Sequence, residues 1–210
     1  LNACSVWGSH WSNVSVQHGA SVVLQDCHCN NSSSHGLFVW GRGSQVTAYS
    51  SSFSSNLGDG VRVECGSKVD LNACQCDNSN KLSGLAVLHQ GSSAVVHSSS
   101  FEGNAHHNVF TKGGASVELH VCQCCCSKSM CGLGMFENSR VKANRCSFSS
   151  CQLNGVSVQG GRAELSECSC RESKTAGGLA VYAGCSVSAS ACDFSCNTLH
   201  NVQVVGGGSA

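Results

Sequence analysis

Residues 178–197 read GLAVYAGCSVSASACDFSCN and hold most of one unit of a pattern that recurs along the chain. In every unit a Gly or Asn precedes a Val or Leu, and these starts are spaced by 23 or 24 residues. A period in this range is typical of a solenoid, in which each unit buries its apolar face only against its neighbours. The units begin at Val14, Leu37, Val61, Leu85, Val109, Leu133, Val156, Leu179 and Val202.

Two positions in each unit predict a corner of the backbone. The first is the residue before each start: Asn13, Gly36, Gly60, Gly84, Asn108, Gly132, Gly155, Gly178 and Asn201. The second lies five or six residues into the unit: Gly19, Gly43, Gly66, Gly91, Gly114, Asn138, Gly161, Gly184 and Gly207. Because Gly and Asn adopt positive φ at little cost, we expect left-handed residues at both corners.

Apolar residues alternate with polar ones between the corners, as in Val61-Arg62-Val63-Glu64. A period of two predicts strands whose apolar side chains point inward. The spacing predicts three short strands in each unit. A helical interpretation fails because Ser and Gly are dense and spacings of three and four are missing.

The unit resembles the repeat of the right-handed parallel β-helix of the pectate-lyase-like superfamily. The resemblance covers the whole chain and is plainest in residues 178–197 and in GVRVECGSKVDLNACQC at residues 60–76. It implies an all-β fold, a right-handed single-stranded parallel β-helix of about nine coils. We expect residues 1–210 to form one segment of a longer solenoid, with partial coils at 1–13 and 202–210. The superfamily contains lyases, hydrolases, epimerases, phage spikes, adhesins and scaffolds, so the resemblance says little about function.

A second pattern spans two coils. Coils that start with Val carry Cys-x-Cys in the third strand, and coils that start with Leu carry Phe there, at Phe53, Phe101, Phe148 and Phe194. Stacking small Cys layers on large Phe layers lets the interior interdigitate at high density.

The eighteen cysteines leave two interpretations open. Their density approaches that of disulfide scaffolds, which indicates an extracellular or cell-surface setting. The inward cysteines suit buried thiols that pack as small apolar groups, and we expect most of them to be reduced. Bridges are expected instead among the turn cysteines, Cys125, Cys126, Cys131, Cys151 and Cys196. Sequons at Asn13, Asn30 and Asn31 near turns would suit a secreted glycoprotein.

Charge and hydropathy exclude several classes of function. Lys plus Arg and Asp plus Glu each number 12, so a nucleic-acid partner recruited by basic charge is not expected. No apolar run approaches the ~18 residues of a membrane span. The run HVCQCCC at residues 120–126 lacks the paired knuckles of a zinc site, so neither metal nor cofactor is predicted.

One outward column gathers charged residues: Asp70, Glu118, Lys142 and Glu164. Carboxylates two coils apart would stand ~9.6 Å from each other, near the outer limit for an inverting glycosidase pair. The favoured interpretation is a charge ladder in which Lys142 neutralises Glu118 and Glu164. No catalytic residue is predicted, and these four form the site of the alternative, a carbohydrate-binding or carbohydrate-active β-helix.

A second outward column alternates polar and large apolar residues on the first strand of each coil. It predicts an exposed stripe made of Phe38, Trp40, Leu88, Phe110, Phe136 and Tyr182. Such a stripe suits a protein interface or a stacking surface for sugar rings, although a covering loop or isolated exposed aromatics would give the same pattern.

The sequence therefore predicts a non-enzymatic structural or interaction solenoid, a segment of an extracellular or surface fibre, stalk or adhesin-like protein. The expected partners are copies of itself or adjacent β-helix segments joined end to end, because open solenoid ends expose unpaired strand edges. Another protein or a glycan along the stripe is a further expected partner. The alternatives are the carbohydrate-binding or carbohydrate-active β-helix and a scaffold subunit of a larger assembly.

Overall fold

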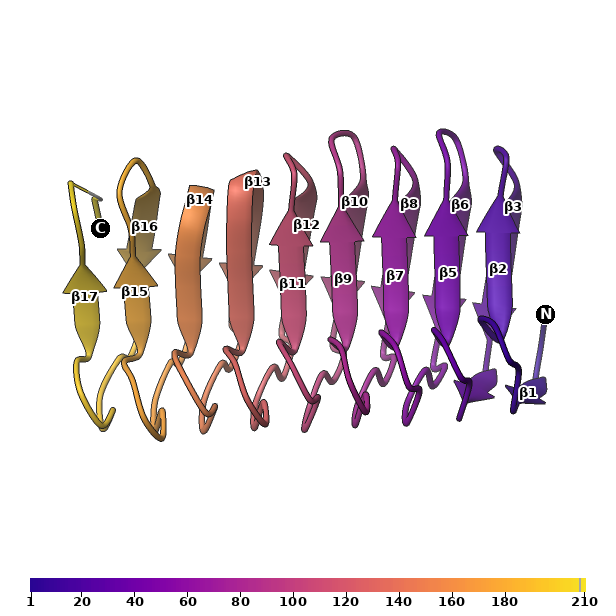
Figure 1. Ribbon diagram of the computed structural model, residues 1–210, viewed down its shortest axis with the longest axis horizontal. Coiled ribbons are helices and arrows are strands. Elements are labelled where there is room, and N and C mark those ends of the chain that lie inside the picture. The colour runs from indigo at the N-terminus through magenta and orange to yellow at the C-terminus, as the bar shows by residue number, and fades with distance from the viewer. Residues whose placement is uncertain (208) are drawn as a thin grey trace.

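A computed structural model describes residues 1–207 and 209–210. Within these residues the chain contains strands and turns and no helix, and every strand pair is parallel. Figure 1 shows the coils side by side along a rod, with the chain termini at opposite ends. The predicted all-β parallel solenoid is confirmed.

The first sheet holds the strand that begins each coil. Its members are β2 (Val14–Gln17), β5 (Leu37–Trp40), β7 (Val61–Glu64), β9 (Leu85–Leu88), β11 (Val109–Lys112), β13 (Leu133–Asn144), β14 (Val156–Ser166), β15 (Leu179–Val181) and β17 (Val202–Val204). Equivalent coil positions pair directly, as Leu37 does with Val61. All the strand starts predicted from the sequence coincide with these strands.

The second sheet follows the second corner. It contains β3 (Ser21–Gln25), β6 (Gln45–Tyr49), β8 (Lys68–Asn72), β10 (Ser93–His97), β12 (Ser116–His120) and β16 (Ser186–Ser190). The strands β13 and β14 run through the corner and belong to both sheets, with a register shift between Phe136 and Ser139.

The third face is shorter than the sequence predicted. Among the described residues, only β1 (Ser5–Trp7) and β4 (His28–Asn30) form strands there. In the later coils the third strand consists of one bridged residue, as in the pair Ser100 and Gln123. These single bridges still continue from coil to coil along this face, from His28 and Ser52 to Ser169 and Asp193.

The two corners differ in their backbone, and one prediction is wrong. All nine residues of the second corner have positive φ, from 59° at Asn138 to 105° at Gly161. None of the nine residues that precede a coil start has positive φ in the described part of the chain. Glycine is needed there for space, because a Cβ on Gly60 would lie 2.7 Å from the carbonyl oxygen of Gly84. At Asn108 the side-chain amide instead donates to the carbonyl of Cys125 at 2.7 Å.

The interior follows the predicted alternation of small and large layers. Phe53, Phe101 and Phe148 are fully buried, and the Cys-x-Cys pairs of the Val coils are buried between them. The predicted inward residues Val63, Leu85, Val87, Cys124 and Phe148 are all buried. Phe194, in the last Leu coil, is only partly buried. The core is one continuous apolar stack rather than a set of separate clusters.

A buried polar ladder runs beside this stack. Buried Asn56 and Asn104 and half-buried Asn197 lie three residues after Phe53, Phe101 and Phe194 respectively. Each Oδ1 accepts a hydrogen bond from the backbone N–H of a serine one coil earlier, at 2.9, 2.9 and 3.0 Å from Ser32, Ser79 and Ser173. The Asn56 amide also donates to the carbonyl of Phe53 at 2.8 Å. These bonds satisfy backbone groups that the turn would otherwise bury unpaired.

We expect Phe101→Ala to lower the free energy of unfolding by ~3–5 kcal/mol, since it empties a layer between two Cys layers. Urea denaturation followed by circular dichroism measures this loss. Phe194→Ala is the matched control and should cost less, because that ring is already partly exposed. A loss below ~1 kcal/mol for Phe101→Ala would contradict the packing described for the core.

Candidate functional site

The charged column predicted on the second sheet exists, with one pairing corrected. Strand register places Asp70, Val95, Glu118, Lys142 and Glu164 on consecutive strands. Lys142 Nζ lies 3.5 Å from Glu164 Oε2, so this half of the ladder is present. No ion pair joins Lys142 to Glu118 among the described residues. Glu118 instead lies 4.0 Å from His120 Nε2 of its own strand.

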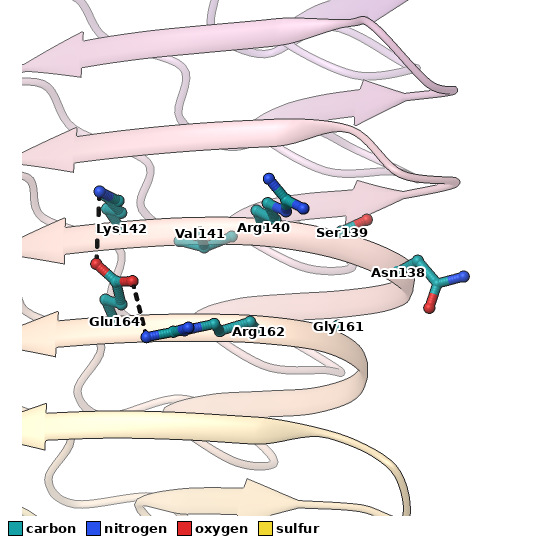
Figure 2. A pocket seen from close by; sticks show the side chains of 8 residues that line it. All are labelled: Asn138, Ser139, Arg140, Val141, Lys142, Gly161, Arg162 and Glu164. Carbon is teal, nitrogen blue, oxygen red and sulfur yellow. Dashed lines mark ion pairs between the residues drawn. The ribbon is translucent and has the colours of Figure 1, made fainter.

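Two arginines that sequence reasoning did not select complete this face. Arg140 and Arg162 pair directly on β13 and β14, and Arg162 Nη2 lies 3.3 Å from Glu164 Oε1. Figure 2 shows Glu164 between Lys142 and Arg162, with Arg140 beside them, around an open hollow. Three cations face one carboxylate, so the hollow carries net positive charge and suits an anionic group. The available signal in the sequence was the column that lies two residues before Lys142 and Glu164, since it holds Arg140 and Arg162.

The predicted stripe on the first sheet faces outward but is less exposed than expected. Phe38, Trp40, Phe110, Phe136 and Tyr182 are half-buried, and Leu88 is only 9% exposed. Imidazoles lie against four of the five rings, those of Phe38, Trp40, Phe110 and Phe136. His107 stacks on Phe110 with ring centroids 5.3 Å apart, and His35 and His18 lie against Phe38 and Trp40. Gly134 makes room for His107, since a Cβ there would lie 2.5 Å from Cε1. The stripe is therefore a series of small clusters, not a continuous open apolar surface.

A buried charge network lies on the same sheet, and sequence reasoning missed it. Asp59 is 2% exposed, and its carboxylate accepts hydrogen bonds from the backbone N–H of Ser83 at 2.9 Å and from Arg62 Nη1 at 3.0 Å. Arg62 also donates from Nε to Glu64 Oε1 at 2.6 Å. Burial raises the pKa of the Asp59 carboxyl to about 6, although Arg62 acts to lower it. The column two residues before the coil start, which holds His35, Asp59, Ser83 and His107, was the available signal.

Two histidines of the same column, His35 beside Asp59 and His107 two coils beyond Asp59, are held neutral. His35 Nδ1 accepts a hydrogen bond from the backbone N–H of Asp59 at 2.9 Å, and burial lowers the pKa of His35 to about 4. The 3.5 Å approach of His35 to the Asp59 carboxylate is therefore not an ion pair between charged groups. Burial, with His106 nearby, lowers the pKa of His107 to about 3. Asp59 and His35 are hydrogen-bonded within this face, whereas the buried Nε2 of His107 has no hydrogen-bond partner among the described residues.

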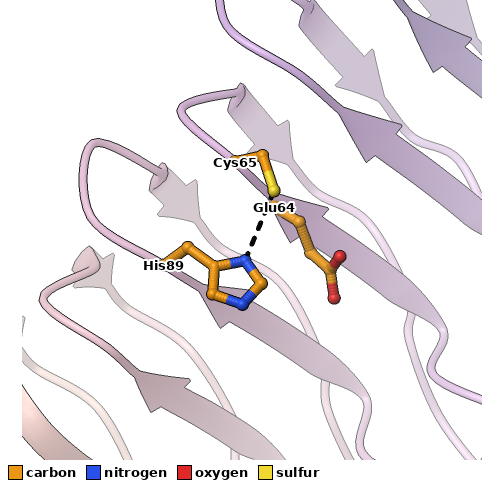
Figure 3. Close-up of side chains that lie close together, drawn as sticks. All are labelled: Glu64, Cys65 and His89. Carbon is orange, nitrogen blue, oxygen red and sulfur yellow. Dashed lines mark hydrogen bonds between the residues drawn. The ribbon is translucent and has the colours of Figure 1, made fainter.

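One corner of the solenoid brings together residues that could hold a metal ion. Glu64, Cys65 and His89 place one donor atom each within 4.8 Å of one another. The Cys65 Sγ and His89 Nδ1 atoms are 3.5 Å apart, and Figure 3 shows them meeting across neighbouring coils with Glu64 beside them. The sequence prediction of no metal site concerned the run at residues 120–126. It held no signal for this corner, since Cys65 and His89 are 24 residues apart and match no ligand motif.

The cysteines are free thiols throughout the described residues, including all five predicted to form bridges. Cys131 and Cys151 are buried in the body of the solenoid, whereas Cys126 and Cys196 are exposed at turns. Cys125 Sγ lies 3.1 Å from Ser147 Oγ rather than beside another sulfur. This arrangement agrees with the expectation that the inward cysteines are reduced. It contradicts the bridges expected among the turn cysteines.

The three sequons differ in access. Asn13 is half-buried, and its amide donates to the carbonyl of Asn30 at 2.9 Å. The Asn30 side chain accepts from the backbone N–H of Ser54 at 2.7 Å. Asn31 is exposed in a turn with φ 58°. Only Asn31 offers an exposed side chain for a glycan.

The comparison with family models matches residues 12–144 to the right-handed beta helix region. The match spans more than half of the chain, and with the parallel coils described above it shows that the protein belongs to this family. No curated protein sequence matches the chain. In the part of the chain that the structure describes, no helix has the length and apolarity to cross a membrane.

We expect the protein to lose stability as pH falls from about 6.5 to 4. The folded-state pKa values of His35 and His107, about 4 and 3, lie below the ordinary value, so the unfolded chain binds more protons in this window. Asp59 acts in the opposite direction, because its raised pKa makes the folded state bind more protons between about 4 and 6.

Thermal melts at several pH values test this balance with two variants. His107→Gln should reduce the loss of stability on acidification, because one buried neutral imidazole is removed. Asp59→Asn should make the loss steeper, because the opposing contribution disappears. Equal pH profiles for the two variants would contradict the assignment.

Proposed function

We propose that the protein is a non-catalytic structural and interaction solenoid that forms a stiff segment of an extracellular or surface assembly. The observation that carries the proposal is the uninterrupted parallel pairing of equivalent positions from β2 to β17 over one continuous core. Such a ladder resists bending because every coil is hydrogen-bonded to the next. Each face of the rod presents equivalent coil positions to a partner at a constant spacing.

The state of the charged groups supports a non-catalytic role. Asp59 has a pKa raised to about 6, a property often found in catalytic acids, yet both its oxygens are engaged and it is 2% exposed. The more accessible Glu164 lies between Lys142 and Arg162. These carboxylates lack the free, facing partner that acid–base hydrolysis requires.

End-to-end association is the proposed mode of assembly. Val202 and Val204 of β17 are exposed, whereas the equivalent Leu179 and Val181 one coil earlier are buried. A coil of another copy stacked on this end would cover these side chains and pair with the backbone of β17.

Val204→Lys should weaken self-association of the chain, because it places a charge at the position that a following coil would bury. Sedimentation velocity over a range of concentrations measures the change. Gln203→Lys is the matched control, since this residue pairs with Ala180 and its side chain alternates to the other face. Equal association of both variants and the unchanged protein would contradict the end-to-end mode. If copies instead docked laterally on the stripe, as in a scaffold subunit, the double variant Trp40→Ser and Tyr182→Ser would weaken their association.

Binding of an acidic carbohydrate is a second candidate function, favoured by the cation-rich hollow of Figure 2. Arg140, Lys142 and Arg162 lie on an open sheet with one carboxylate among them, which suits the carboxylate groups of a uronic-acid polymer.

A polyuronate titrated at low salt tests this candidate. Binding that weakens in Arg140→Gln with Arg162→Gln, and not in Lys68→Gln on the same sheet, would support it. We expect no turnover of the polymer. Turnover that disappears in Glu118→Gln or Lys142→Ala would favour the carbohydrate-active alternative over the structural one.

A further inference from the structure

We propose that Glu64, Cys65 and His89 form a binding site for a single Zn²⁺ ion or a similar borderline-soft divalent metal, at the corner between the first and second sheets. The site does not depend on the role proposed for the rod. It rests on three donor atoms of different types that two neighbouring coils bring within 4.8 Å of one another.

The distance between the sulfur and nitrogen donors fits one tetrahedral ion. Zinc binds thiolate at ~2.3 Å and imidazole at ~2.0 Å, so two such ligands at the tetrahedral angle stand about 3.5 Å apart. Cys65 Sγ and His89 Nδ1 are separated by 3.5 Å. Figure 3 shows the two exposed side chains directed toward each other.

The third donor is already oriented by a neighbouring charge. Arg62 donates from Nε to Glu64 Oε1 at 2.6 Å, and no described residue donates to Oε2. A carboxylate held on one oxygen by a second residue is the usual arrangement of a metal ligand. Thiolate and carboxylate together carry two negative charges, which balance a divalent ion. The fourth position is open to water, and Arg42 and Lys68 line the adjacent hollow, where their charge favours an anionic fourth ligand.

The fold does not require these side chains at this corner. The equivalent positions in the coils on either side are Gly41 and Gly113, both with positive φ. Cys65 and His89 adopt the same left-handed conformation, with φ 56° and 71°, although glycine adopts it more easily. The two ligand-type residues therefore stand in consecutive coils at a position where the backbone favours glycine.

Binding at this site releases a proton. The Cys65 S–H bond breaks, the sulfur forms a bond to the metal, and the proton passes to solvent. Metal affinity should therefore fall as pH falls, because protons compete for the thiolate and for the imidazole nitrogen.

The test titrates the whole chain, kept reduced by a phosphine, with Zn²⁺ by calorimetry and with Co²⁺ by absorption. We expect one site, and with Co²⁺ a thiolate-to-metal charge-transfer band in the near ultraviolet. Cys65→Ser should abolish the band, and His89→Gln should weaken binding about 100-fold or more, because it removes a direct ligand where lost supporting bonds already cost 10–100-fold. Glu64→Gln should weaken binding less than either.

Cys126→Ser is the matched control. Cys126 is also an exposed turn cysteine with positive φ, at 60°, and the described residues place no metal-ligand group around it. Its substitution should leave the band and the affinity unchanged. The proposal would be overturned if the unchanged protein took up no metal, or if Cys126→Ser lowered uptake as much as Cys65→Ser. Circular dichroism shows whether each variant folds. If Cys65→Ser does not fold, the metal affinities of Glu64→Gln and His89→Gln decide the outcome.

Discussion

Parallel hydrogen bonding between equivalent positions of successive coils is the constraint from which the other features of this protein follow. When Leu37 pairs with Val61 and Val61 with Leu85, every position of the coil becomes a column of stacked side chains. Each column must then pack with itself at the spacing of neighbouring strands, ~4.8 Å. A column that alternates small Cys with large Phe fills the closed core at that spacing, because the layers interdigitate. Fully buried Phe101 accordingly lies between Cys layers, and buried Asn104 alternates with serines in its own column, where its Oδ1 accepts from the backbone N–H of Ser79.

The same constraint organises the outside of the solenoid. On the first sheet, the turn before each strand directs side chains back over the strand, so that His35 and His107 cover Phe38 and Phe110. Asp59 is buried in this layer and held by Arg62. The second sheet has no such cover, and its charges remain accessible around Glu164. The two faces therefore differ: side chains from the turns cover the first, and the charged groups of the second stay accessible.

The cysteines show how composition and geometry can lead to different conclusions. Eighteen cysteines in 210 residues resemble the composition of a disulfide scaffold. Most of them instead occupy inward columns, where the thiol packs as a small apolar group between larger layers, and all eighteen are free. The argument for an oxidising compartment thereby loses the bridges on which it rested, and the extracellular address stays a proposal. The exposed Cys65 differs from the inward set because an imidazole and a carboxylate lie beside it.

The sequence by itself determined the coil length, the strand starts, the second corner and the inward residues, because these depend on local chemistry: a period of two, and Gly or Asn where φ is positive. It also placed Asp70, Glu118, Lys142 and Glu164 in one column, since a constant period fixes which residues share a column. It could not decide how side chains fill the space between columns. Only the tertiary structure showed that Gly60 is needed for a close backbone approach rather than for positive φ. It also showed that imidazoles lie against most rings of the stripe, and that Glu64, Cys65 and His89 meet at one corner. These features depend on rotamers and on contacts between adjacent coils, which the sequence period does not specify.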